Sequence, residues 1–272
     1  MSERRQLRPL AEFPLPERAR IRALLTDIDD TLTDHGRLPA ASYGAMERLR
    51  EAGLIVIPVT GRPAGWCDLI ARQWPVDAVV GENGAFYFRH LEPEKRMQRV
   101  HALDADTRAA NRVRLEAIKA EVLAAVPGAA VAADQAYREA DLAIDYAEDM
   151  APLPPAAIDR IAAIFERHGA TAKVSSIHVN GWYGAYDKLS MARRLLAEAF
   201  DIDADADRMS IVFIGDSPND GPMFRHFPQA VGVANVLDFA ERLADKPHWV
   251  TRARAAAGFV ELAEALLAAR RV

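Results

Sequence analysis

Two acidic clusters in the sequence stand directly after apolar runs. The first reads Asp27-Ile28-Asp29-Asp30-Thr31, and the second reads Gly215-Asp216-Ser217-Pro218-Asn219-Asp220. Asp27 and Asp29 are two residues apart, so on a strand their side chains point to the same side. Carboxylate oxygens around an open site suit Mg²⁺, which takes a few protein ligands, several waters and a substrate phosphate. These acids therefore predict a magnesium site.

A hydroxyl group and an ammonium group accompany the acids. Thr60-Gly61-Arg62 follows the apolar run 54–59, and Lys188 opens a stretch expected to be a helix. In such a site the ion and Lys188 neutralise phosphate oxygens while a carboxylate attacks phosphorus and forms an aspartyl-phosphate. A second acid is then needed to protonate the leaving oxygen and later to activate water. The combination favours phosphoryl transfer.

The elements that carry these clusters alternate between strand and helix. Apolar runs predict strands at 21–29, 54–59 and 76–80, and helices are expected at 40–51 and after Pro63, which suits the first turn of a helix. This alternation requires right-handed crossovers and a parallel sheet covered on both faces. Ligands of such sheets bind outside the carboxyl ends of the strands, so the clusters should meet in one crevice.

The pattern changes after Ala85. Short strands are expected at 86–89, 96–100, 142–147 and 172–179, with helices at 105–126 and 156–168. The first pattern returns with a helix at 188–200, strands at 211–214 and 230–234, and a final helix at 259–269. We therefore predict an α/β protein with a doubly wound, Rossmann-like core over residues 21–86 and 185–272. An inserted α+β cap should occupy residues 87–184, and residues 1–20 should form a loose tail.

In their order along the chain, the four clusters resemble the four motifs of the haloacid dehalogenase (HAD) superfamily of phosphatases. Matched by position, Asp27 resembles the nucleophile and Asp29 the general acid/base. Thr60 resembles the phosphate-binding hydroxyl, and Lys188 resembles the lysine that stabilises charge. The resemblance implies an enzyme that hydrolyses phosphoric monoesters through an aspartyl-phosphate on Asp27.

The same resemblance implies how metal and phosphate are held. Mg²⁺ would be bound by the carboxylates of Asp27 and Asp216 and by the backbone carbonyl of Asp29. Asp220 would either bind the metal or orient one of its ligands. The residues implied in phosphate binding are Thr60, Gly61, Lys188 and Asn219.

The segment Gly81-Glu82-Asn83-Gly84-Ala85 is similar to the strand-end loop of the Cof-like, IIB branch of this superfamily, and the insertion after it resembles a C2-type cap. That branch includes sugar-phosphate phosphatases. Asp30 departs from the pattern, because many relatives have Gly or Asn there. Polar residues near the motifs or on one face of the predicted strand 172–179 are candidates for substrate binding: Arg62, Asn83, Ser176, His178 and Asn180.

Composition restricts the partners and the compartment. Lys and Arg number 34 against 39 Asp and Glu, and this net charge of −5 lacks the basic excess that nucleic-acid binding requires. The single cysteine, Cys67, permits no internal disulfide and favours a reducing compartment. No apolar run approaches the ~18 residues of a membrane span, and prolines and charges interrupt the N-terminus. We expect a soluble cytoplasmic protein whose oligomeric state is left open.

These observations predict a Mg²⁺-dependent phosphatase that acts on a small phosphorylated metabolite, with a sugar phosphate as the expected substrate. A phosphosugar mutase of the same architecture would instead pass the phosphoryl group from Asp27 to a sugar hydroxyl. A phospho-aspartate signalling protein also joins strand-end acids, a threonine and a lysine in a parallel sheet. Such a protein needs no insertion over its site, so the length of this chain argues against it.

Overall fold

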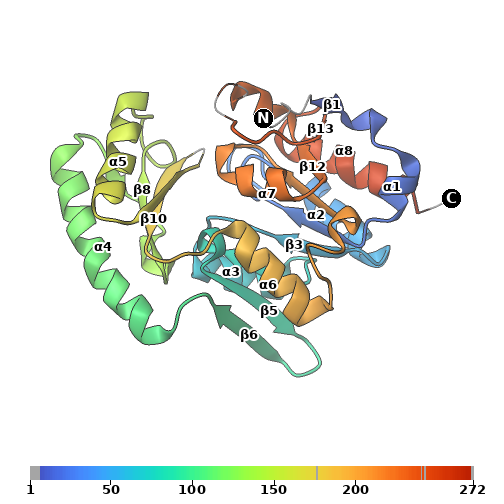
Figure 1. The fold of residues 1–272 in the computed structure, drawn as a ribbon, viewed down its shortest axis with the longest axis horizontal. Coiled ribbons are helices and arrows are strands. Elements are labelled where there is room, and N and C mark those ends of the chain that lie inside the picture. Colours follow the sequence, from blue (N-terminus) through green and yellow to red (C-terminus); the bar gives the residue numbers. More distant parts are fainter. Residues whose placement is uncertain (1–6, 176, 240, 242, 271–272) are drawn as a thin grey trace.

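A six-stranded parallel sheet runs through the larger part of the molecule in the computed structural model, which describes residues 7–175, 177–239, 241 and 243–270 (Figure 1). The strand order is β1-β13-β12-β11-β2-β3, and every neighbouring pair is parallel. The strands are β1 (Arg8–Pro9), β2 (Ala23–Thr26), β3 (Ile55–Pro58), β11 (Ile211–Gly215), β12 (Gln229–Gly232) and β13 (Trp249–Val250). The two predicted acidic clusters follow β2 and β11, which are direct neighbours.

Both faces of this sheet are buried under helices, as the continuous apolar runs predict. Along β2, Leu24 packs into one core with α2, α3 and α8, whereas Ala23 and Leu25 pack into a second core with α6 and α7. The helices are α2 (Ala40–Glu51), α3 (Ala64–Gln73), α6 (Lys188–Phe200), α7 (Gly221–His226) and α8 (Ala255–Ala268). The predicted doubly wound α/β core is confirmed. No helix in the described ranges combines the length and the apolar character that a membrane crossing needs.

The N-terminal segment belongs to the core, so the prediction of a loose tail over residues 1–20 is wrong for residues 7–20. β1 pairs with β13, and α1 (Leu15–Ala19) follows. The Phe13 ring is buried and stacks on Trp249 with 5.1 Å between centroids. The prolines and charges around these few apolar residues concealed them in the sequence. Residues 1–6 lie outside the described residues.

A hairpin extends the sheet beyond β3. β4 (Val79–Gly81) adjoins β3 through a parallel bridge between Val59 and Val80. β5 (Phe86–Leu91) pairs antiparallel with β4, and β6 (Arg96–His101) pairs antiparallel with β5. The expectation that these two strands belong to the insertion is wrong, because β5 is hydrogen-bonded to β4 of the core. We propose that the cap begins after β6.

The cap, residues 105–182, has a four-stranded antiparallel sheet of order β7-β8-β10-β9 with α4 and α5 packed on its outer face (Figure 1). Its elements are α4 (Ala105–Ala125), β7 (Ala130–Val131), β8 (Asp141–Asp145), α5 (Pro155–Arg167), β9 (Thr171–Val174) and β10 (His178–Trp182). Ile144 and Val179 face the helices, so His178 and Asn180 face the other side by the period of two. The single strand expected at 172–179 is instead the hairpin of β9 and β10.

Short 3-10 helices occupy several connections. They are η1 (Leu10–Glu12), η2 (Glu82–Gly84), η3 (Gln135–Tyr137), η4 (Arg208–Ser210), η5 (Pro218–Asp220) and η6 (Ala234–Phe239). Two of them bear on the site described below, because η2 contains Asn83 and η5 ends at Asp220.

The burial of Phe13 makes a first testable prediction. We expect Phe13→Ala to lower the free energy of unfolding by about 3 kcal/mol, because it removes a buried ring and leaves a cavity against Trp249. Leu15→Ala is the control, since Leu15 is 41% exposed and should cost no more than about 0.5 kcal/mol. Urea denaturation of both variants measures the difference. Equal, small losses would show that the segment does not contribute to the core.

Candidate active site

Lys188 lies between two buried carboxylates at the carboxyl ends of the central strands. Its Nζ is 2.7 Å from Oδ1 of Asp27 and 2.8 Å from Oδ1 of Asp220. Asp27 follows β2 and donates its backbone N–H to Ile214 of β11 at 2.9 Å, so the strand ladder fixes its position. Asp27, Asp216 and Asp220 each offer one carboxylate oxygen within 4.8 Å of the others. The structure thus brings together three clusters that are far apart in the sequence.

The charges in this group do not balance. Burial raises the pKa of Asp27 to about 7, although Lys188 acts in the opposite direction. Burial and the charges of Asp27 and Asp220 also raise the pKa of Asp216 well above its usual value. Burial disfavours the Lys188 ammonium, but the two carboxylates it binds outweigh this and raise its pKa. When all three carboxyl groups are ionised, one ammonium against three carboxylates leaves two negative charges, which fits a divalent cation held by oxygen ligands.

Asp220 uses both of its oxygens within the protein. Oδ1 accepts from Lys188, and Oδ2 accepts from the backbone N–H groups of Asp216 at 3.1 Å and Ser217 at 3.3 Å. A Cβ at Gly215 would lie 2.3 Å from Asp220 Oδ2, so only glycine permits this approach. Of the two roles that the sequence left open for Asp220, these contacts favour orientation of the loop that carries Asp216.

Asp29 is paired with a different cation. The Arg62 guanidinium donates from Nε and Nη2 to the Asp29 carboxylate at 2.8–3.1 Å, and it stacks on the Trp66 ring at 4.3 Å. Both oxygens of Asp29 accept from this fork. A hydrogen bond between Asp29 and a leaving-group oxygen therefore requires that Arg62 gives up one of these contacts.

Glu148 of the cap completes a chain of charges that sequence analysis missed. Arg62 Nη2 is 2.7 Å from Glu148, whose other oxygen is 2.9 Å from Nε2 of His178. Partial burial would raise the pKa of Glu148, but its contacts with His178 and Arg62 outweigh it and lower the pKa to about 2. In the sequence, Glu148 stands in a polar turn after a strand and resembles a solvated acid. Its partner Arg62 is distant in the sequence, so no local pattern could reveal it.

A second buried cluster ties the cap to the core. Arg138 makes paired hydrogen bonds with Asp134 and with Asp141, and it donates to the backbone carbonyl of Gly61 at 3.0 Å. Asn180 donates to the same Asp141 at 2.9 Å. Asn180 is therefore engaged inside the protein.

Glu82, a residue of the core, also connects the core with the cap. Its carboxylate accepts from the backbone N–H of Ala64 in the core and from those of Glu139, Ala140 and Asp141 in the cap at 2.7–3.2 Å. Burial and the charge of Asp141 raise the pKa of Glu82 to about 8. Four donors on one buried carboxylate hold the cap loop against the strand-end loop of the core.

Most of the predicted site residues line one narrow cavity between the core and the cap, here called the catalytic cavity: Asp27, Asp29, Gly61, Arg62, His178, Asn180, Asp216 and Asn219. Thr60, Asn83, Lys188 and Asp220 are buried next to these residues but are not part of the lining. Thr60 Oγ1 accepts from the backbone N–H of Arg62 at 3.0 Å, and the Asn83 amide packs under Gly61. Ser176 lies outside the described residues.

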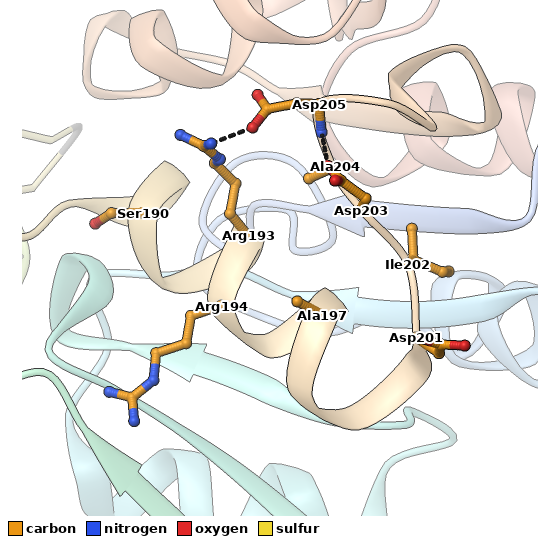
Figure 2. A pocket seen from close by; sticks show the side chains of 9 residues that line it. All are labelled: Ser190, Arg193, Arg194, Ala197, Asp201, Ile202, Asp203, Ala204 and Asp205. Carbon is orange, nitrogen blue, oxygen red and sulfur yellow. Dashed lines mark hydrogen bonds and ion pairs between the residues drawn. The ribbon is translucent and has the colours of Figure 1, made fainter.

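A wider surface pocket lies elsewhere, between α6 and the loop that follows it (Figure 2). Its volume is about 470 Å³. Its two arginines are engaged locally, because Arg193 pairs with Asp205 and Arg194 pairs with Glu198. None of the predicted site residues lines it, so we do not consider it the active site.

Comparison with known proteins identifies the family that the motifs resemble. Residues 24–112 match the family of haloacid dehalogenase-like hydrolases. This stretch includes Asp27, Asp29 and Thr60. The comparison with curated proteins gave no match. The predicted resemblance to the HAD superfamily is confirmed.

Solved structures share the fold over nearly the whole chain. The C-terminal domain of trehalose-6-phosphate phosphatase from C. albicans matches with a TM-score of 0.69 and 13% identity, covering 98% of this chain and 99% of that one. Sucrose-phosphatase from Synechocystis in complex with sucrose and phosphate matches with a TM-score of 0.61 and 17% identity, covering 90% and 97%. A haloacid dehalogenase-like hydrolase from Bacteroides thetaiotaomicron matches with a TM-score of 0.61 and 15% identity, covering 90% and 98%. At these identities the likeness establishes the fold.

The excess of buried carboxylates predicts proton-linked metal binding. Because the pKa of Asp27 is raised to about 7, its carboxyl group is mostly protonated at pH 6 and mostly ionised at pH 8. Mg²⁺ binds the ionised form, and the raised pKa of Asp216 acts in the same direction, so we expect its affinity to be at least about tenfold higher at pH 8 than at pH 6. Isothermal titration calorimetry in buffers of different ionisation enthalpy measures both the affinity and the proton release. Asp216→Asn should remove most of the binding, and an affinity independent of pH would contradict the prediction.

Proposed function

We propose that this haloacid dehalogenase-like hydrolase cleaves phosphoric monoesters of small metabolites, with sugar phosphates as the preferred class. The observation that carries the proposal is the position of the Lys188 ammonium between Asp27 and Asp220, beside Asp216, at the end of the two central strands. The sugar-phosphate phosphatases among the structures with this fold support the substrate class. Mg²⁺ dependence and a cytoplasmic location are part of the same proposal.

The first half of the proposed reaction forms an aspartyl-phosphate. An oxygen of Asp27 attacks phosphorus, the bond from phosphorus to the leaving oxygen breaks, and Asp29 gives its proton to that oxygen. Lys188 lies 2.7 Å from the attacking carboxylate and holds it in place. Bound Mg²⁺, held by Asp27, Asp216 and the backbone carbonyl of Asp29, would supply positive charge to the phosphate oxygens.

The second half returns the enzyme to its starting state. Asp29, now ionised, takes a proton from water, the water oxygen attacks phosphorus, and the bond to Asp27 breaks to release phosphate. The paired contacts with Arg62 fix the orientation of Asp29 at the cavity wall. This arrangement suits the base step, whereas the acid step needs Arg62 to release one oxygen.

Three further groups would bind the phosphate. The Thr60 hydroxyl accepts from Arg62 N–H, which leaves its own hydrogen to donate to a phosphate oxygen. The backbone at Gly61 and the side chain of Asn219 line the cavity beside Asp27. Together with Lys188, these donors would stabilise the charge that develops in the transition state.

Asp27→Asn tests the covalent step. We expect kcat to fall about 10³-fold or more, because an amide is a poor nucleophile towards phosphorus. The melting temperature of the metal-free variant should not fall below that of the wild type, since the substitution relieves repulsion among the buried carboxylates while Lys188 keeps Asp220 as a partner. Steady-state assays with p-nitrophenyl phosphate and thermal unfolding measure the two quantities. Substantial turnover by a folded variant would exclude Asp27 as the nucleophile.

Asp29→Asn tests the acid step. Protonation matters most for a poor leaving group, so kcat/KM should fall about 10²-fold more for a sugar phosphate than for p-nitrophenyl phosphate. kcat/KM is the appropriate quantity because it reports the steps up to the aspartyl-phosphate. Asp30→Asn, at the neighbouring acid, is the control at saturating Mg²⁺ and should leave the ratio unchanged. Equal losses on the two esters would contradict an acid role for Asp29.

A further inference from the structure

The catalytic cavity offers little positive charge to a second anion. Besides the residues already named, its wall contains Ser175, Ile177 and Ser217. Among the described residues that line it, Arg62 is the only lysine or arginine. Lys188 is not part of the lining and is bound to two carboxylates.

The charge of Arg62 is already balanced by acids. It is bound to Asp29 on one side and to Glu148 at 2.7 Å on the other, and Asp134 lies 3.7 Å from its Nη1. The guanidinium is almost completely buried, so solvent ions do not replace these partners. The ring of His178 also contacts an acid, because Nε2 lies 2.9 Å from Glu148.

The cleft that adjoins the cavity has no lysine or arginine among its described lining residues. An outer cleft of about 380 Å³ adjoins the cavity and shares Ser175 and Ser217 with it. Its other lining residues are Tyr146, Pro155, Ile158, Asp159, Val174, Pro218 and Phe239. Within the described chain, the only charged side chain in this lining is therefore the carboxylate of Asp159.

We propose that this site selects phosphoric monoesters whose leaving group carries no charge, and that Glu148 is the residue that sets the selection. The inference rests on the proposed function. A carboxylate or second phosphate on the leaving group would enter a space where Arg62 is already neutralised. The carboxylate of Glu148, in contact with Arg62 and His178 of the cavity wall, and that of Asp159, in the outer cleft, add negative charge around this space. Placing an unpaired anion in such a partly desolvated space is costly.

A neutral polyol meets a different environment. The cavity and the outer cleft present hydroxyl and amide groups for sugar hydroxyls, and Tyr146 and Phe239 offer apolar rings. Groups of this kind bind uncharged, hydroxyl-rich molecules without an ion pair. The same charge pattern disfavours the phosphosugar mutase reaction, in which a bisphosphate must place its second phosphate in this space.

Matched pairs of esters test the selection in the full-length enzyme with Mg²⁺. Glycerol 3-phosphate and 3-phosphoglycerate differ only in a hydroxymethyl group replaced by a carboxylate, and glucitol 6-phosphate and 6-phosphogluconate form a six-carbon pair. We expect kcat/KM to favour the neutral member of each pair by at least about tenfold, with the preference shrinking as ionic strength rises. Glu148→Gln should raise the relative kcat/KM of the charged members about tenfold. Glu94→Gln, at an exposed acid of the β5–β6 turn, should leave the ratios unchanged.

The outcomes separate the inference from the proposed function. If the enzyme hydrolyses p-nitrophenyl phosphate but treats both members of each pair equally, the inference is wrong and the phosphatase assignment stands. If it hydrolyses none of the esters, the proposed function fails and the inference fails with it. A wild-type preference that Glu148→Gln does not change would overturn the role of Glu148. If Glu148→Gln fails to fold, the wild-type ratios and their salt dependence still decide the selection.

Discussion

Three carboxylates are buried around one ammonium group at the carboxyl ends of β2 and β11, and the surrounding structure holds this charge in place. Lys188 is the first residue of α6, and its position is fixed by a capping box in which Asp187 and Ser190 exchange hydrogen bonds. A Cβ at Gly84 would lie 2.0 Å from the carbonyl oxygen of Asp187, so the strand-end loop of the core also depends on this contact. The N-terminal capping box of α6 thereby helps to set the distance between the Lys188 ammonium and Asp27, the proposed nucleophile.

The two catalytic acids differ in their partners, and the difference suits their proposed roles. Asp27 binds the ammonium of Lys188, a compact charge that contacts a single oxygen of the attacking carboxylate. Asp29 binds the planar fork of Arg62, which engages both of its oxygens and fixes the plane of the carboxylate. Asp27 therefore has a second carboxylate oxygen that does not bind Lys188 and that can attack phosphorus. Asp29 is held in orientation until a substrate or a movement of the cap displaces Arg62.

The sequence predicted the parts of the molecule that local patterns specify. The helix bounds 40–51 and 188–200 agree with α2 and α6, and the strand-end clusters meet as expected. The β9–β10 hairpin was missed because its turn contains no glycine or proline that marks a break. The hairpin of β5 and β6 was assigned to the cap instead of the core. The residues of a strand show that it is a strand but not which strand it pairs with, so the pairing of β5 with β4 could not be predicted. Glu148 was missed for the same reason, since its role depends on a partner in another unit.

The coupling between cap and core follows from where the buried charges sit. Glu82 of the core accepts from the backbone of the cap loop, and Arg138 of the cap donates to the backbone of Gly61 in the proposed phosphate-binding loop. In each contact a side chain of the core or the cap is hydrogen-bonded to the backbone of the other. Separating cap and core would leave these buried groups without partners, which is energetically costly. The cap is therefore anchored through Gly61 and Glu82, beside the catalytic residues. The chain of Asp29, Arg62 and Glu148 crosses the same boundary, and it links the position of the cap directly to the carboxylate that we propose as the general acid/base.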